Sequence, residues 1–130
     1  MREYLFAYGT LQAAHAPQQI VSLLEKLRFV GAASARGVLY DLGDYPGAVL
    51  DPSSGHKVFG MVYEVLDIAN TLPELDRYEE FDPQAPSESL FVRVLQPVEL
   101  ESGQMLPCWI YSFNRDPGAA PVFSHGRYLK

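Results

Sequence analysis

The sequence predicts an α+β domain built on a small, strongly curved and mainly antiparallel β-sheet, which closes on itself as a β-barrel flanked by two α-helices. Two observations carry this prediction. Short apolar runs typical of strands follow one another through most of the chain, separated by turns rich in glycine and proline. Two other segments instead have their apolar residues at helical spacing. A simple sandwich of two sheets is the architectural alternative.

Length and composition favour a single domain over residues 1–130. The chain has 130 residues, of which 48% are hydrophobic, and it contains no internal repeat, low-complexity segment or linker. No apolar run approaches the ~20 residues that a membrane helix needs, and the N-terminus lacks the pattern of a signal peptide. We therefore expect a soluble, cytoplasmic protein with no membrane partner.

The first element is an apolar strand that ends near Tyr8. The run "YLFA" favours a strand, whereas Gly9 breaks it, so a bent loop over "YGTL" should follow. The next segment, "APQQIVSLLEKL", begins with Pro17, which suits a first helical turn. Its apolar residues then recur at helical spacing: Ile20, Leu23, Leu24 and Leu27. This pattern predicts a helix that covers the sheet.

A series of strand-like runs begins at "RFVGAASARGVLYDL" and continues with "GAVL", "KVFGMVYEVL", "FVRVLQPVEL" and "MLPCWIYSF". The last two, joined by "ESGQ", are expected to form an antiparallel hairpin, and so are the runs that flank "DPSSGH". Cys108 in the final run is expected to be a small buried thiol without chemistry of its own.

The second helix is predicted within "NTLPELDRYEEF". Thr71 with Glu74 three residues later has the pattern of an N-terminal capping box, and Pro73 suits the first turn.

Helical geometry then separates two neighbouring acids near the end of this helix. At about 100° per residue, Glu79 falls in angle between Leu72 and Leu75, on the face that packs on the core, whereas Glu80 lies nearer the solvent. An inward carboxylate should have a raised pKa, and the negative end of the helix acts in the same direction. Glu79 is therefore a candidate general acid/base. The competing interpretation is a surface glutamate on a helix whose register differs by one residue.

Charge and motifs exclude several functional classes. The net charge of −6, with ten Lys plus Arg, argues against nucleic-acid binding. No phosphate-loop, dinucleotide, G-x-S-x-G or paired-Cys motif is present. His15, His56 and His125 lack metal-ligand spacing, so no metal is expected. A two-carboxylate glycosidase using Glu79 and Asp44 stays open, because the sequence does not fix the separation of these acids.

Several motifs in order resemble the γ-glutamylcyclotransferase-like family, including its AIG2-like and γ-glutamylamine cyclotransferase branches. They are "YLFAYGTL", "LYDLGDYPGAVL", "VFGMVYEV", "LDRYEEF", "FVRVLQPVEL" and "CWIYSF", and they cover the chain from Tyr4 to about Tyr128. The resemblance implies a small closed barrel, a pocket beside a Tyr-Gly-Ser/Thr-Leu loop, and a catalytic glutamate in an "LDxxE" turn. In this sequence the glutamate is Glu79, and the loop is Tyr8, Gly9, Thr10 and Leu11.

The resemblance also implies a reaction without a cofactor. The α-amine of a small γ-glutamyl substrate attacks its own side-chain amide, giving 5-oxoproline and a free amine, with Glu79 moving the proton. The Gly9 loop could face either the oxyanion or the substrate's α-carboxylate. Arg93 and Tyr111 are further pocket candidates, although strand alternation could equally turn them outward. Pro46 is expected to shape the rim.

Two positions depart from the family pattern. Family members often have Gly after the motif glutamate and Tyr two places before the strand arginine, where this chain has Glu80 and Phe91. These departures leave open which branch supplies the substrate. A non-catalytic small-molecule-binding protein that keeps the same pocket is the alternative function.

Overall fold

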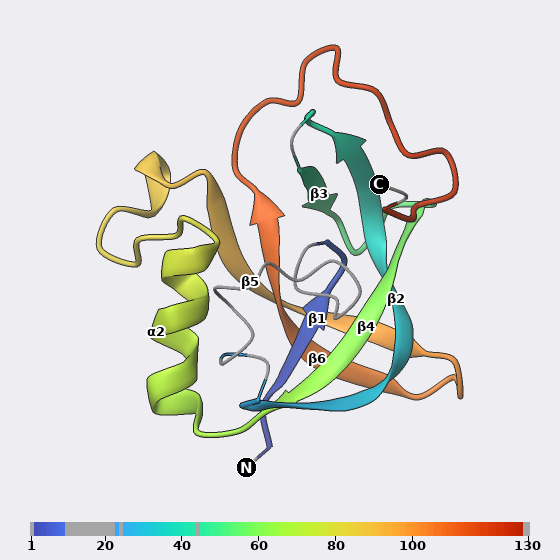
Figure 1. Cartoon of the computed structure of the whole chain (residues 1–130). Coiled ribbons are helices and arrows are strands. Elements are labelled where there is room, and N and C mark those ends of the chain that lie inside the picture. The colour runs from blue at the N-terminus through green and yellow to red at the C-terminus, as the bar shows by residue number, and fades with distance from the viewer. Residues whose placement is uncertain (1, 10–22, 24, 44, 129–130) are drawn as a thin grey trace.

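The computed structural model describes residues 2–9, 23, 25–43 and 45–128 (Figure 1). Along the chain these residues form β1 (Tyr4–Ala7), β2 (Leu27–Asp41), β3 (Pro46–Leu50), β4 (Lys57–Val65), α2 (Ile68–Tyr78), the 3-10 helix η3 (Pro86–Glu88), β5 (Phe91–Leu100) and β6 (Met105–Phe113). Most of the predicted first helix lies outside the described residues. Leu27, placed in that helix by its spacing, is instead the first residue of β2.

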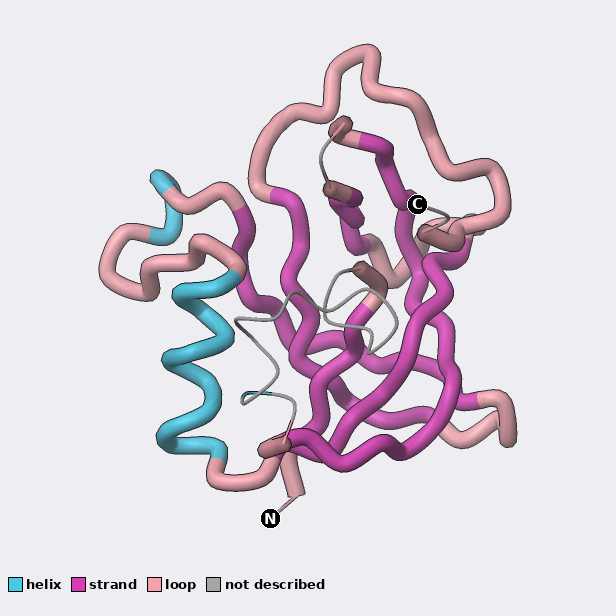
Figure 2. Tube along the Cα trace, viewed as in Figure 1, coloured by secondary structure: helices cyan, strands magenta, loops and turns pink. Residues whose placement is uncertain are grey.

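Five strands close into a barrel. The sheet order is β3-β2-β4-β1-β6-β5, and β5 pairs back onto β2 at Ala33↔Leu100 and Ser34↔Glu99. The ring therefore runs β2-β4-β1-β6-β5, while β3 extends it along the end of β2. Among the described strands every pairing is antiparallel except that of β1 with β6. The predicted closed, mainly antiparallel barrel is confirmed, with α2 beside it (Figure 2).

One predicted hairpin is present and the other is not. Strands β5 and β6 pair antiparallel from Phe91↔Phe113 to Glu99↔Met105, on either side of the "ESGQ" turn. The predicted pairing across "DPSSGH" is wrong, because both flanking strands pair with β2 instead. At 15 residues, β2 is long enough to pair with β4 along its first part and with β3 along its last part.

Strand β1 contributes to both hydrophobic cores, because successive side chains of a strand point to opposite faces. Phe6 joins the core inside the barrel, which also holds Leu39, Val58, Val62, Val98 and Ile110. Leu5 and Ala7 join the second core, beneath α2, with Leu75, Phe91 and Tyr111. The apolar run at the N-terminus therefore ties the helix to the barrel.

Helix α2 begins earlier than predicted. Its N-cap is Asp67, in a left-handed conformation, and Thr71 lies inside the helix. The capping box predicted at Thr71 is wrong because its hydroxyl is fully buried and donates a hydrogen bond to the Leu66 carbonyl at 2.8 Å. Within the described part of the chain, no helix has the length and apolar character needed to cross a membrane.

Candidate functional site

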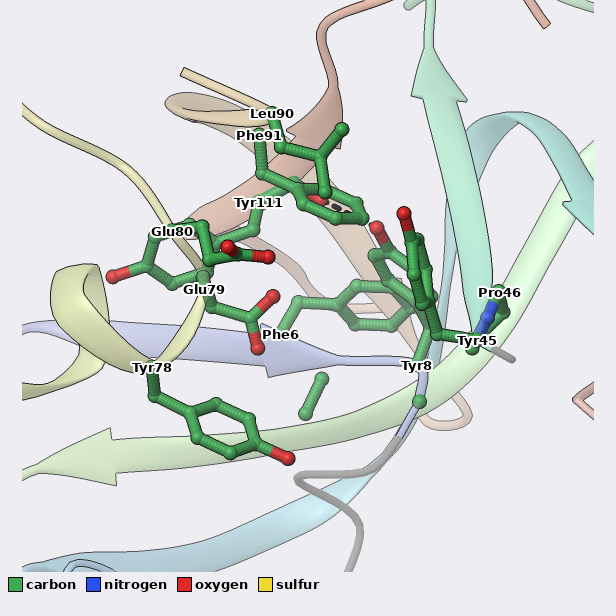
Figure 3. Close-up of a pocket in the computed structure, with 12 residues that line it drawn as sticks. Phe6, Tyr8, Tyr45, Pro46, Tyr78, Glu79, Glu80, Leu90, Phe91 and Tyr111 are labelled. Atoms are coloured by element: carbon green, nitrogen blue, oxygen red, sulfur yellow. Dashed lines mark hydrogen bonds between the residues drawn. The ribbon is translucent and has the colours of Figure 1, made fainter. Parts of the chain in front are cut away.

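A cavity of about 300 Å³ opens where the end of α2 faces the ends of β1 and β6 and the starts of β3 and β5 (Figure 3). Five of the residues predicted from the sequence line it: Tyr8, Gly9, Pro46, Glu79 and Tyr111. The other described lining residues are Phe6, Ala7, Tyr45, Tyr78, Glu80, Leu90 and Phe91. Thr10 and Leu11 lie outside the described residues.

The C-terminal turn of α2 sets the position of Glu79, which is the C-cap of the helix. The Glu80 N–H donates to the Arg77 carbonyl at 3.2 Å, and the Phe81 N–H donates to the Asp76 carbonyl at 2.8 Å. These two bonds form a Schellman motif, which requires a left-handed residue just after the cap. Glu80 is that residue, with φ of 57°.

The two acids at this turn have different surroundings. Glu79 is half-buried and its carboxylate points into the cavity, whereas Glu80 is exposed at the rim (Figure 3). Burial, and then the neighbouring charge of Glu80, raise the pKa of Glu79 to about 7. Within the described part of the chain, no Lys, Arg or His forms an ion pair with either acid. Glu79 can therefore hold or release a proton near neutral pH.

The Tyr8 side chain fixes the wall opposite Glu79. Its hydroxyl donates to the Tyr111 carbonyl at 2.5 Å and accepts from the Ala48 N–H at 3.2 Å. Burial raises the pKa of Tyr8 far above its usual range, so the phenol stays protonated.

Gly9 follows Tyr8 at the point where the chain passes close to Pro46. A Cβ on Gly9 would lie 3.0 Å from the Pro46 Cγ. Gly9 does not have a positive φ, so unusual dihedrals do not explain the glycine here. The close approach of Gly9 to Pro46 at the pocket rim explains it instead.

Arg93 lies outside this cavity. Its guanidinium donates to both carboxylate oxygens of Asp76, at 2.9 and 3.2 Å, and stacks over the Trp109 ring at 4.8 Å. Arg93 lies two positions after the lining residue Phe91, and a strand advances about 3.3 Å per residue. Arg93 is thereby carried along β5 to the groove beneath α2.

Asp76 is the buried acid that the sequence reasoning missed. It is 4% exposed and accepts a hydrogen bond from the Tyr111 hydroxyl at 2.6 Å, in addition to those from Arg93. The spacing that selected Glu79 also points to this residue, because Asp76 follows Leu72 by four positions on the same helix. Burial and the bond to Asp76 raise the pKa of Tyr111 above its usual range.

The sequence model described as "Gamma-glutamyl cyclotransferase, AIG2-like" matches residues 5–130. The chain belongs to this family. No curated protein matches the chain.

Solved structures have the same fold as this AIG2-like member. An AIG2-like protein from Mus musculus has a TM-score of 0.74 at 24% identity, with 98% of this chain and 88% of that one covered. YkqA from Bacillus subtilis has a TM-score of 0.71 at 23% identity, covering 98% of this chain but 40% of that longer protein. A gamma-glutamyl cyclotransferase has a TM-score of 0.62 at 18% identity, covering 94% and 70%.

The two departures from the AIG2-like pattern now have structural descriptions. Glu80 occupies a left-handed position, where glycine is favoured because it has no Cβ. Phe91 lines the cavity and packs against Tyr45 and Phe113, with ring centroids 6.0 and 5.6 Å away, but it does not fill the space.

Among the described residues of this AIG2-like chain, no three His, Cys, Asp or Glu side chains are grouped so that they could hold a metal ion. Cys108 is buried in β6, and burial raises the pKa of its thiol to about 12, so it remains an unreactive thiol at neutral pH. Asp44, the possible partner of Glu79 in a glycosidase, lies outside the described residues.

Proposed function

We propose that this chain cyclises the γ-glutamyl group of a small γ-glutamyl amino acid or amine to 5-oxoproline and releases the free amine, with Glu79 as the general acid/base. One observation carries the proposal. A carboxyl group that forms no ion pair with a described residue, and whose pKa is about 7, points into a cavity of about 300 Å³ in a member of the gamma-glutamyl cyclotransferase family. No cofactor is required for this reaction.

Proton transfer is the task that suits Glu79. As the substrate α-amine forms a bond to the side-chain amide carbon, the attacking nitrogen must lose protons. When the C–N bond of the amide then breaks, the leaving nitrogen must gain them. A carboxyl group with a pKa of about 7 is populated in both states at neutral pH, so it can accept a proton and return it. Such catalysis typically contributes about 10²–10⁴-fold.

The remaining walls of the cavity supply binding and orientation. In the proposal, the backbone N–H of Gly9 faces the oxyanion or the α-carboxylate of the substrate. Aromatic side chains at Tyr8, Tyr45 and Phe91 limit the room for water and hold the γ-glutamyl chain folded. Orientation of this kind favours ring closure over hydrolysis.

The proposal is tested by following 5-oxoproline release from a panel of γ-glutamyl amino acids, γ-glutamyl amines and γ-glutamyl-lysine. Glu79→Gln is expected to abolish turnover with the fold retained. Glu80→Gln is the matched control, one residue away with the same change, and should keep substantial activity. Absence of product across the panel refutes the enzymatic proposal, and binding without product supports a non-catalytic binding protein.

A further inference from the structure

We infer that Asp76, held by Arg93 and by the Tyr111 hydroxyl, is a positioning residue that fixes the Glu79 carboxylate against the wall formed by Tyr8. This inference rests on the proposed function for its kinetic consequences. Its geometry is independent of that function. Neither Asp76 nor Arg93 lines the cavity, so any effect on the reaction must act through neighbouring groups.

Three hydrogen bonds from two residues hold the Asp76 carboxylate. The Arg93 Nε and Nη2 atoms lie 2.9 and 3.2 Å from its two carboxylate oxygens, and the Tyr111 hydroxyl donates to Oδ1 at 2.6 Å. Paired, forked hydrogen bonds fix the direction of a carboxylate as well as its position. The Arg93 guanidinium also lies over the rings of Trp109 and Phe81, whose centroids are 4.8 and 5.6 Å away. The whole cluster is therefore rigid on the barrel side of α2.

Tyr111 connects this cluster to the opposite wall of the cavity. Its hydroxyl binds Asp76, while its backbone carbonyl accepts the hydrogen bond from the Tyr8 hydroxyl. Tyr8 in turn accepts from the Ala48 N–H of β3. A single path of hydrogen bonds thus runs from β3 through the end of β1 and across β6 to α2. In Figure 3 the Tyr111 side chain extends from the Tyr8 side of the cavity toward the helix that carries Glu79.

Asp76 also belongs to the turn that carries Glu79. Its carbonyl accepts the Phe81 N–H, which closes the Schellman motif around Glu79 and Glu80. The side chain of Asp76 therefore binds the barrel while its main chain closes the helix end. If the side-chain bonds are lost, the turn is free to shift, and a misplacement of about 1 Å at a reacting group can cost about 10²-fold in rate.

Tyr111→Phe is the sharpest test, because it removes the hydroxyl that binds Asp76 but keeps the ring and the carbonyl that binds Tyr8. We expect kcat to fall about 10–100-fold at a nearly unchanged KM. Asp76→Asn should behave alike, and the double variant should lose little more than the worse single variant, because both changes break one connection. Gln96→Leu is the control. It removes the hydrogen bond from Gln96 on β5 to the Arg36 carbonyl on β2, and neither residue lines the cavity.

The pH profile of kcat is a second readout, which separates a positioning role from a loss of folded protein. Among the described residues, the titratable side chains that line the cavity with Glu79 are Tyr78 at the end of α2, Glu80 just after it, Tyr8 after β1, Tyr45 before β3 and Tyr111 on β6. Glu80 is the carboxylic acid among these neighbours. A displaced Glu79 is better solvated, so the acidic limb of the pH profile of kcat should move to lower pH in Tyr111→Phe. In Gln96→Leu it should stay in place.

Carbon-13 NMR of the glutamate carboxyl groups provides the same measurement without turnover. It reports whether the pKa of Glu79 falls from about 7 toward its ordinary value of 4.5 in Tyr111→Phe and Asp76→Asn. If the native protein makes no 5-oxoproline but this shift occurs, the proposed function fails and the positioning role stands. Folded variants with an unshifted Glu79 and a native kcat overturn the positioning role.

Discussion

Glu79 links the chemistry of the site to the stability of the fold. Its pKa is about 7 in the folded protein against an ordinary value of 4.5. Between these values the folded chain holds a proton that the unfolded chain has released. The stability contributed by the protonated group is therefore complete below pH 4.5 and is lost as the pH rises through about 7.

Removing this group should flatten that dependence. The free energy of unfolding of the native protein, compared with that of Glu79→Gln, should fall by on the order of 3 kcal/mol as the pH rises from 4.5 to 8. Urea unfolding of both proteins across this range measures the difference, and other titrating groups cancel because both proteins share them. A difference that stays constant with pH would show that Glu79 has an ordinary pKa in the folded state.

Glu80 carries a backbone cost that another residue would avoid. Its φ of 57° places a Cβ in the left-handed region, which costs about 1–2 kcal/mol for most residues. We expect Glu80→Gly to stabilise the protein by about 1 kcal/mol and to raise Tm by about 3 °C. The substitution also removes a like charge beside Glu79, so the pKa of Glu79 should fall.

Glu80→Gln separates the two effects in the same thermal melts. It removes the charge but keeps a Cβ at the left-handed position, so it should lower the pKa of Glu79 without the full gain in Tm. If Glu80→Gln and Glu80→Gly raised Tm equally, the destabilising effect of Glu80 would come from charge repulsion and not from backbone strain.

The sequence predicted an individual site residue where helical spacing showed which face of the helix is buried. The spacing of Leu72 and Leu75 predicted that Glu79 points inward, and the structure places it so. Arg93 could not be placed, because alternation along a strand gives a face but not the distance to a helix that packs on it. Asp76 was missed because a buried acid is recognised by its partners, and these lie 17 and 35 positions away in the sequence.

At the scale of elements, Thr71 explains why the start of α2 was misplaced. A threonine before a helical run has the same local pattern whether it caps the helix or lies inside it. In the structure Thr71 is buried and its hydroxyl donates to the carbonyl of Leu66, the residue just after β4, a contact that the capping pattern does not reveal. The residue therefore fastens α2 to the strand before it.

Thr71→Val tests this role with little change in shape. The variant leaves the Leu66 carbonyl without its hydrogen bond, and we expect a loss of about 1–3 kcal/mol. Chemical denaturation measures the loss. Asn70→Ala is the neighbouring control, since it removes only exposed hydrogen bonds to Asp67 and should change stability by less than about 0.5 kcal/mol. Equal effects of the two substitutions would contradict the role of Thr71.

Strand pairing was predictable where the turn is short and not elsewhere. The "ESGQ" turn joins β5 to β6 with almost no chain to spare, so the two strands pair with each other. The six residues 51–56 between β3 and β4 do not force these two strands to pair with each other. Both instead form hydrogen bonds with the longer strand β2. Such a choice depends on the whole sheet.

At the scale of the molecule, closing five strands into a ring brings backbones close together. Side chains fill the interior, so the candidate site lies at one end of the barrel, where α2 leaves room. The C-terminal segment also binds two strands of the ring. The Phe59 N–H on β4 donates to the Gly126 carbonyl at 2.8 Å, and the Asp41 N–H on β2 donates to the Pro121 carbonyl at 2.7 Å.

The tightest described approach within the ring is at Gly60 on β4. A Cβ there would lie 2.2 Å from the Ala7 carbonyl oxygen and 3.0 Å from the Phe6 ring, and neither the backbone nor the core side chain can yield freely. Gly60→Ala should therefore force β1 away from β4 and cost about 2–4 kcal/mol. Because β1 leads directly into Tyr8 and Gly9, the same shift should also raise KM.

Gly55→Ala is the matched control, because it makes the same change in the loop before β4, where nothing lies within 4 Å of the added Cβ. Its effect on stability should stay within about 0.5 kcal/mol. Urea unfolding of both variants measures the difference. Equal stability of the two would mean that β1 and β4 can separate without cost. The barrel would then be too loose for its closure to hold the Tyr8 wall against Glu79, and the geometry of the site would have to come from α2 and the Asp76 cluster alone.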